Sequence, residues 1–113
     1  MTNLILHDID EPNIKRDNSL ATSIKDYPEN KKFDVIAMNP PFGGVEEDII
    51  QYNFPVDMRT SETADLFMVL IMNRLKENGR AGVILPDGFL FGNDNAKIAI
   101  KRSCLKILTF IQL

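Results

Sequence analysis

The sequence has a single cysteine, no long hydrophobic run and no secretory signal, and each absence excludes a class of protein. Cys104 has no second cysteine with which to form an internal disulfide, which is typical of proteins from the reducing cytoplasm. No stretch approaches the roughly 18 continuous apolar residues that a membrane-spanning helix requires. Residues 1–4 lack the basic region and apolar core of a signal peptide. We therefore expect a cytoplasmic protein with no membrane partner.

Positive charge is scarce as well. The chain carries 13 Lys and Arg residues against 16 Asp and Glu residues, which gives a formal net charge of −3. Neutralising DNA phosphates requires clustered Lys and Arg, so this segment is not expected to be the main DNA-gripping surface, although it could still act on a base. Its 113 residues, 44% of them hydrophobic and 26% charged, indicate one small soluble domain, and we expect no metal site.

The order of strands and helices indicates the fold class. Short apolar runs predict buried strands over residues 33–38 and 81–85, the second stopped by Pro86, and a last strand over residues 107–113. A polar loop with a helical turn is expected over residues 21–32. Strands that alternate with helices form a mostly parallel sheet flanked by helices, so we predict an α/β fold.

Two helices are predicted between these strands. The first begins at Thr60, Ser61 or Thr63, where Glu62 and Asp65 suit the positive end of the helix dipole, and it ends at a left-handed cap formed by Gly79. Its inward-facing residues recur at helical spacing and are Leu66, Phe67, Leu70, Ile71 and Leu75. The second spans residues 94–105, with inward-facing Ile98, Ile100 or Ala99, Cys104 and Leu105.

The remaining segments are less regular. Residues 2–8 predict a short helix, interrupted by Pro12, and residues 13–20 predict a short strand that ends near Asp17. Residues 43–60 predict an irregular loop, and a loop of this length in a compact domain is usually functional or disordered.

The most informative stretch is Asn39-Pro40-Pro41-Phe42, called the tetrad below, which follows the strand predicted over residues 33–38. Prolines cannot donate backbone hydrogen bonds, so carbonyl groups here stay free as acceptors. The Asn39 amide oxygen adds an acceptor, and Phe42 offers a flat apolar face. Acceptors beside a stacking ring suit the binding of a planar amino group. The alternative is a turn that merely ends a strand.

Three polar clusters follow predicted strands: Asp17, the tetrad, and Pro86-Asp87-Gly88. The carboxyl ends of parallel strands meet at one edge of a sheet, where ligands bind. We therefore expect these clusters to converge. The individual residues also have simple structural explanations, since Asp17 and Asp87 could be solvated loop or turn residues.

With its longer context, the tetrad resembles a motif of the modification (methyltransferase) subunit of type I restriction–modification systems. The matching blocks are Asn39–Gly44, Thr60–Phe67 and Gly79–Gly92, and they cover nearly the whole chain. The resemblance implies transfer of a methyl group from S-adenosylmethionine (SAM) to the exocyclic amino group of a flipped adenine in DNA. It implies that Asn39, Pro40, Pro41 and Phe42 are the catalytic residues, and that Asp17 and Asn39 contact the cofactor.

The chain departs from that family in one respect. The glycine-rich loop that holds the methionine part of SAM, and the acidic residue that binds its ribose, do not occur in it. We therefore expect a partial Rossmann-like methyltransferase domain over residues 1–113 that lacks the first strands, the cofactor half and the C-terminal recognition regions. Such a chain is expected to be inactive alone and to self-associate through its sheet edge or through Leu4, Ile5 and Leu6.

Two alternatives remain open at this point. Methyltransferases acting on protein glutamine or on guanine in RNA share the Asn-Pro-Pro-aromatic motif, although the Thr60–Phe67 and Gly79–Gly92 blocks favour the DNA enzyme. The other alternative is a non-catalytic remnant that acts as an interaction module. The expected partners of the complete enzyme are DNA and the specificity and restriction subunits.

Overall fold

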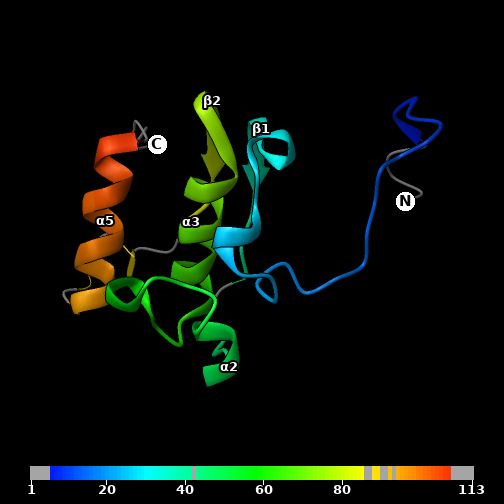
Figure 1. Cartoon of the computed structure of the whole chain (residues 1–113). Coiled ribbons are helices and arrows are strands. Elements are labelled where there is room, and N and C mark those ends of the chain that lie inside the picture. The colour runs from blue at the N-terminus through cyan, green and yellow to red at the C-terminus, as the bar shows by residue number, and fades with distance from the viewer. Residues whose placement is uncertain (1–5, 42, 86–87, 90–91, 93, 108–113) are drawn as a thin grey trace.

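The fold is described by a computed structural model that covers residues 6–41, 43–85, 88, 89, 92 and 94–107. Helices and strands alternate along this part of the chain (Figure 1). In chain order the elements are η1 (Ile24–Asp26), η2 (Glu29–Lys31), β1 (Phe33–Met38), α2 (Asp48–Gln51), η3 (Val56–Met58), α3 (Thr63–Arg74), β2 (Leu75–Val83) and α5 (Asn95–Ile107). Within the described residues, no helix is long and apolar enough to cross a membrane.

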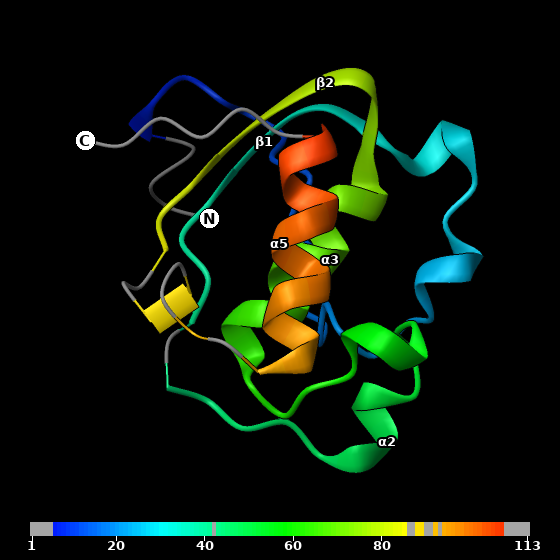
Figure 2. The same ribbon diagram turned by 90° about the vertical axis from the view of Figure 1, so that its left-hand side faces the viewer.

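Strands β1 and β2 form a parallel sheet of two strands. The residues from Val35 to Met38 pair in order with Arg80 to Val83. Phe33 pairs with Leu75, so the register is irregular between Phe33 and Val35. Parallel strands require a long crossover connection, and α3 lies in that connection. Helix α3 contacts both β2 and α5; the two helices lie side by side in Figure 1, and α5 lies in front of α3 in Figure 2. The prediction of an α/β fold with a parallel sheet is confirmed.

The hydrophobic core is centred on α3, which is buried along most of its length. Four of the five residues predicted to face inward are buried, and Phe67 is half-buried. Side chains from other segments complete the core, namely Leu20, Phe54, Phe89 and Ile100. Full burial of a large apolar side chain contributes roughly 1.5–3 kcal/mol, so the enclosure of α3 is a large stabilising contribution.

The strands are less buried than predicted. Ile36 packs against the core, whereas Val35 is 68% exposed on the opposite face of the sheet. The same alternation continues after β2, where Leu85 packs inward and Ile84 is 61% exposed. Continuous apolar runs are typical of parallel strands that are covered on both faces. The described residues cover one face. The strand predicted over residues 33–38 is confirmed, the one predicted over residues 81–85 begins earlier and spans Leu75–Val83, and the prediction that these strands are buried is wrong.

The C-terminal end of α3 also differs from the prediction. The helix stops at Arg74 and the chain continues directly as β2, so Gly79 is a strand residue and not a helix cap. The left-handed residue is Asn78, with a φ of 65°, a conformation that asparagine tolerates. Gly79 serves a close approach instead, because a Cβ there would lie 2.9 Å from the Lys76 carbonyl oxygen.

The N-terminal segment contradicts the predicted strand near Asp17. Residues 12–16 form neither helix nor strand, and the segment extends away from the body of the molecule (blue in Figure 1). A lone strand would leave its backbone groups without partners, which explains why none forms there. Of the helix predicted over residues 2–8, Leu6 is helical and residues 2–5 lie outside the described part. The predicted loop over residues 21–32 does contain helical turns, η1 and η2.

The C-terminal helix matches its prediction closely, since α5 covers residues 95–107. Ile100 is buried as predicted, whereas Ile98 is 41% exposed. Ile107 ends the helix and does not begin the last predicted strand, of which residues 108–113 lie outside the described part. The side chains of Cys104 and Leu105 are not among those described, so their predicted burial stays a prediction.

Candidate functional site

The tetrad begins at the residue that follows β1, at the carboxyl end of the strand. Asn39 is exposed, Pro40 is buried and Pro41 is exposed, while Phe42 lies outside the described residues. None of the hydrogen bonds among the described residues uses the Asn39 amide. Burial of Pro40 fixes the backbone, and the neighbouring amide faces solvent. The Asn39 amide is therefore exposed at the sheet edge, and its role as an acceptor for a ligand stays a prediction.

The segment after β2 runs alongside the start of the tetrad. The Ile84 backbone N–H donates to the Met38 carbonyl at 3.2 Å, so the pairing of the strands continues to the residue before Asn39. Of the cluster predicted after this strand, Pro86 and Asp87 lie outside the described residues. The structure thus brings the two strand ends together, and it leaves the part that Asp87 plays as a prediction.

The turn that follows the tetrad, Gly43 to Glu46, is fixed to the start of α3. The Thr63 N–H donates to the Gly44 carbonyl at 3.1 Å, and the Glu46 N–H donates to the Ser61 carbonyl at 2.8 Å. The Thr63 hydroxyl also donates to Glu46 Oε1 at 3.3 Å. A Cβ on Gly44 would lie 2.6 Å from Thr63 Oγ1, so this close approach requires glycine. Gly43, with a φ of 70°, supplies the left-handed turn.

A second set of contacts at the start of α3 is a buried ion cluster. The Lys97 ammonium on α5 donates to Asp65 Oδ2 at 2.5 Å and to a Glu62 carboxylate oxygen. The Asp94 carboxylate is 3.9 Å from the same ammonium. The Lys97 side chain is 6% exposed and the Asp65 side chain is 1% exposed. Gly92 leaves room for the lysine stem, because a Cβ on Gly92 would lie 2.3 Å from Lys97 Cδ.

The protonation of this cluster follows from burial and from its neighbours. Burial lowers the pKa of Lys97, but the hydrogen bonds to Asp65 and Glu62 raise it by more, so the pKa lies above its ordinary value of 10.5. Burial raises the pKa of Asp65 above its ordinary value, the bond to Lys97 opposes that effect, and the Glu62 and Asp94 carboxylates add to it. Lys97 is therefore a cation at neutral pH.

Asp17 lies on the extended N-terminal segment, and its contacts among the described residues are with Lys15 and Asn18 and not with the tetrad. Its carboxylate is 3.0 Å from the Lys15 ammonium, and its side chain is 54% exposed. It also accepts a hydrogen bond of 2.9 Å from the Asn18 backbone N–H. The hydrogen bond and charge of Lys15 lower the pKa of Asp17 below its ordinary value. A contact between Asp17 and a cofactor stays a prediction.

Sequence reasoning assigned the Thr60–Asp65 cluster to helix capping and overlooked Lys97. Thr63 instead bonds to the turn after the tetrad, Glu62 pairs with Val45 in an isolated bridge, and Asp65 is buried in the ion cluster. A signal was present, since Lys97 precedes buried Ile100 by three positions and so shares its helix face. In the described part of the chain, no group of His, Cys, Asp or Glu side chains is arranged to hold a metal ion.

Comparisons with known proteins identify similar chains. A family model for N-6 DNA methylases matches residues 1–110. The type I restriction enzyme EcoEI methylase subunit of Escherichia coli is 51% identical over 102 residues, which cover 89% of this chain and 20% of that protein. The EcoKI methylase subunit of Escherichia coli K12 is 35% identical over 97 residues, which cover 80% of this chain and 17% of that protein.

Solved structures agree with the sequence comparison. The modification subunit assigned to a type I restriction enzyme from Vibrio vulnificus YJ016 matches with a TM-score of 0.82 and 43% identity, over 91% of this chain and 22% of that chain. A structure of the type I R-M system matches with a TM-score of 0.81 and 39% identity, over 91% of this chain and 20% of that chain. The chain spans about a fifth of the length of these relatives.

Proposed function

Because this chain belongs to the N-6 DNA methylase family, we propose that it forms the base-binding part of a type I restriction–modification methyltransferase subunit. The reaction is transfer of a methyl group from SAM to the exocyclic amino group of adenine in DNA. The two parallel strands then belong to a Rossmann-like sheet, and the partners are DNA and the specificity and restriction subunits. The observation that carries the proposal is the exposed Asn39 amide directly after β1, at the sheet edge where ligands bind.

The residues of the tetrad can hold an amino group in a reactive state. Adenine is inaccessible inside the duplex, so it must be flipped out of the stack before it reaches this edge. The Asn39 carboxamide oxygen and the Pro40 carbonyl oxygen then accept the two amino hydrogens. These acceptors draw the nitrogen lone pair out of conjugation and hold the positive charge that develops on the nitrogen. No general base is needed before the nitrogen is methylated.

Pro41 and Phe42 complete the proposed site. Pro41 has no N–H that would compete for the acceptors, and it restricts the backbone before Phe42. The Phe42 ring stacks on the flipped base, and stacking of this kind contributes about 1–3 kcal/mol per base. The turn from Gly43 to Glu46, fixed to α3 by its hydrogen bonds to Ser61 and Thr63, keeps the tetrad in place.

The described residues fit the amino group better than they fit SAM. SAM supplies the methyl group when it is bound, but the chain contains no glycine-rich loop for its methionine part. Gly43 and Gly44 cannot substitute, because they follow the tetrad in the chain. The Asp17 carboxylate is paired with Lys15 on the extended segment. We therefore propose that the 113-residue chain is inactive alone.

The experiment replaces Asn39 by alanine in a complete methylase subunit that carries this segment. Single-turnover methylation of DNA with labelled SAM should be slowed about 100-fold or more, while SAM affinity changes little, because the lost contact matters most in the transition state. Asn30→Ala, at an exposed position of η2, is the matched control and should leave the rate unchanged. An unmodified rate for Asn39→Ala would mean that the tetrad only ends a strand.

The same assay separates the alternatives. A subunit that methylates RNA guanine or protein glutamine, and not DNA adenine, would overturn the DNA assignment while keeping the role of Asn39. A complete subunit that transfers no methyl group to any of these substrates would favour the interaction module.

A further inference from the structure

The buried ion cluster joins three segments of the chain. Lys97 belongs to the first turn of α5, and its ammonium bonds to Glu62 and Asp65 at the start of α3. Asp94 caps α5 by accepting the Lys97 N–H at 2.9 Å through Oδ1. The lysine stem packs against Gly92, in the segment that follows β2. One buried side chain thus connects the start of α3, the start of α5 and the segment between β2 and α5.

The start of α3 is also the part of the molecule that holds the tetrad. Glu62 pairs with Val45 in an isolated antiparallel bridge. The next residue, Thr63, donates to the Gly44 carbonyl at 3.1 Å. A movement of Glu62 or Asp65 therefore passes directly to the backbone three to five residues beyond Pro41. Lys97 and Asp65 are buried, whereas the Glu62 and Asp94 side chains are 54% and 52% exposed, so it is the buried Lys97–Asp65 pair that holds the start of α3 against α5.

We propose that Lys97 and Asp65 are positioning residues for methyl transfer, acting through Glu62, Thr63 and Gly44 on Asn39. The inference rests on the proposed function of the tetrad. Lys97 does not touch the substrate, since its ammonium is enclosed by the carboxylates and its side chain is 6% exposed. Buried ion pairs are frequently replaceable by apolar residues without loss of stability. Their directional hydrogen bonds fix the position of the start of α3, which contacts the turn after the tetrad.

The test compares Lys97→Met with Asn39→Ala in a complete methylase subunit that carries this segment. Methionine keeps the unbranched stem that packs on Gly92 and removes the ammonium. We expect the single-turnover methyl-transfer rate to fall about 10- to 100-fold, since displacement of a reacting group by about 1 Å costs this much, with DNA and SAM affinities changed less than about 2-fold. Lys76→Met, which breaks an exposed ion pair with Asp34, is the matched control and should leave the rate unchanged.

Hydrogen exchange supplies a second readout that does not depend on activity. In Lys97→Met the Glu46 and Thr63 amides, which bond to Ser61 and Gly44, should exchange faster. The Asn53 and Phe54 amides, which bond within the loop around α2, should keep their rates. An equal rise at all four amides would indicate general destabilisation and would overturn the positioning role.

A double variant separates positioning from stability. Lys97→Met with Asp65→Leu replaces the ion pair by an apolar pair and should recover the melting temperature without recovering the methyl-transfer rate. Recovery of both would overturn the proposal, as would an unmodified rate in Lys97→Met when Asn39→Ala is slow. If Asn39→Ala itself has the unmodified rate, the proposed function fails. Hydrogen exchange of the Glu46 and Thr63 amides then decides alone whether the cluster holds the turn in position.

Discussion

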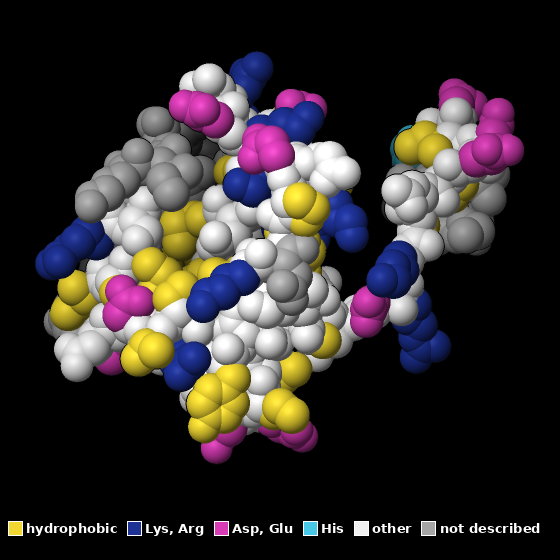
Figure 3. All heavy atoms as spheres, viewed as in Figure 1, with side chains coloured by type: hydrophobic (Ala, Val, Ile, Leu, Met, Phe, Trp, Pro, Cys, Tyr) yellow, Lys and Arg dark blue, Asp and Glu magenta, His cyan; other side chains and the backbone are white. Residues whose placement is uncertain are grey.

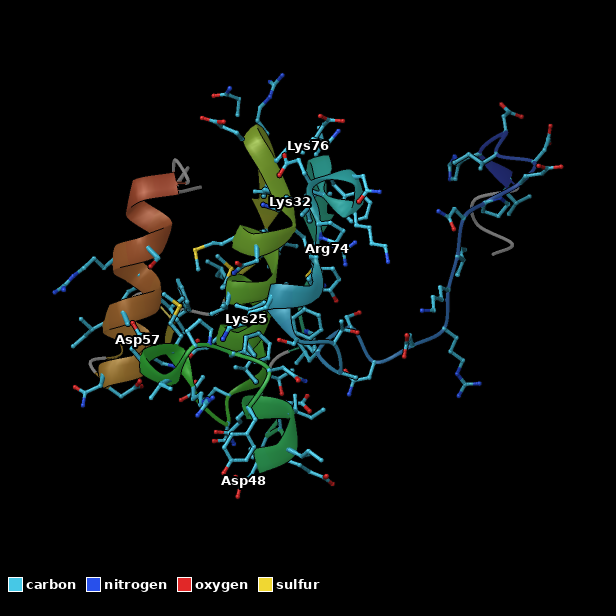
Figure 4. All side chains as sticks on the ribbon, in the orientation of Figure 1. Lys25, Lys32, Asp48, Asp57, Arg74 and Lys76 are labelled. Carbon is cyan, nitrogen blue, oxygen red and sulfur yellow. The ribbon has the colours of Figure 1, made fainter. Side chains whose placement is uncertain are left out.

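The Arg74 guanidinium carbon lies 4.0 Å from the centre of the Tyr27 ring, at the point where α3 ends. The same group lies 4.8 Å from the centre of the Phe33 ring. Its Nε and Nη2 atoms donate to the Lys31 carbonyl at 3.2 and 3.0 Å. Figure 4 places the Arg74 side chain beside the chain that leads into β1. The end of the central helix therefore fixes the start of the strand that carries the tetrad.

Arg74→Met should lower the free energy of unfolding by roughly 1–2 kcal/mol, because it removes two cation–π contacts and a forked hydrogen bond. Urea denaturation of the 113-residue chain measures the change. Arg74→Lys should give an intermediate loss, since an ammonium keeps the charge and loses the fork. Lys76→Met removes an exposed ion pair of 3.4 Å and should cost less than about 0.5 kcal/mol. Equal losses in Arg74→Met and Lys76→Met would show that the rings contribute nothing.

Local patterns in the sequence were sufficient to predict the elements that carry the site. The spacing of Leu66, Leu70 and Ile71 predicts α3, and the apolar run before Asn39 predicts β1 with the tetrad at its carboxyl end. These features depend on residues that are close together in the chain. Burial of the strands was not predictable in this way, since it depends on what covers the second face of the sheet.

The contacts that fix the site could not be predicted, because they join distant positions. Lys97 and Asp65 are 32 residues apart, and Thr63 and Glu46 are 17 apart. A charged residue at an inward helical position signals a buried partner without identifying it. The end of α3 was misjudged because Gly79 is typical of a helix cap, whereas here glycine permits a close backbone approach.

The 113-residue chain should bind SAM with a dissociation constant weaker than micromolar. The chain has no glycine-rich loop, and its candidate cofactor residue Asp17 is exposed and paired with Lys15. Calorimetric titration of the chain with SAM checks this, with a complete methylase subunit as the positive control. Micromolar binding by the chain would contradict the prediction and would identify a cofactor site elsewhere in it.

The 113-residue chain should also self-associate through the open face of its sheet. Val35 is 68% exposed and Ile84 is 61% exposed on that face, next to a strand edge that is unpaired among the described residues. Val35→Lys should therefore shift the chain toward the monomer in light scattering. Figure 3 shows that apolar side chains are also exposed over α2, where Ile49 is 71% exposed, so Ile49→Lys is the matched control. A clean monomer at high concentration, or an equal effect of both variants, would contradict the use of the sheet.

The stability of the chain should fall at alkaline pH because of Lys97. Its pKa is raised above 10.5 in the folded state, so folding favours the protonated form. The stabilising contribution is therefore fully present below pH 10.5 and is lost as the pH rises through the folded-state pKa. Urea unfolding from about pH 9 to about pH 11.5 should show a steeper loss for the unmodified chain than for Lys97→Met. Parallel profiles would exclude the contribution of Lys97.

Gly44→Ala should disturb the contact between the turn after the tetrad and the start of α3. The new Cβ would lie 2.6 Å from Thr63 Oγ1 and 3.2 Å from Thr63 Cβ, so the turn or the helix start must shift. Overpacking of this kind costs about 1–3 kcal/mol of unfolding free energy. Gly82→Ala is the matched control, because a Cβ on Gly82 meets nothing within 4 Å, and it should be neutral or slightly stabilising.

Adding Thr63→Ala to Gly44→Ala should recover part of the loss, because it removes the hydroxyl that lies closest to the new methyl group. The two substitutions should therefore be non-additive in a double-mutant cycle, with a coupling of about 0.5–3 kcal/mol. Recovery should be incomplete, since the Thr63 Cβ position remains and the hydrogen bond to Glu46 is lost. In a complete methylase subunit that carries this segment, the methyl-transfer rate should follow the same order: unmodified, double variant, Gly44→Ala. Strict additivity of the two substitutions would mean that Gly44 does not rest on Thr63 in solution, and the route by which α3 holds Asn39 would have to lie elsewhere.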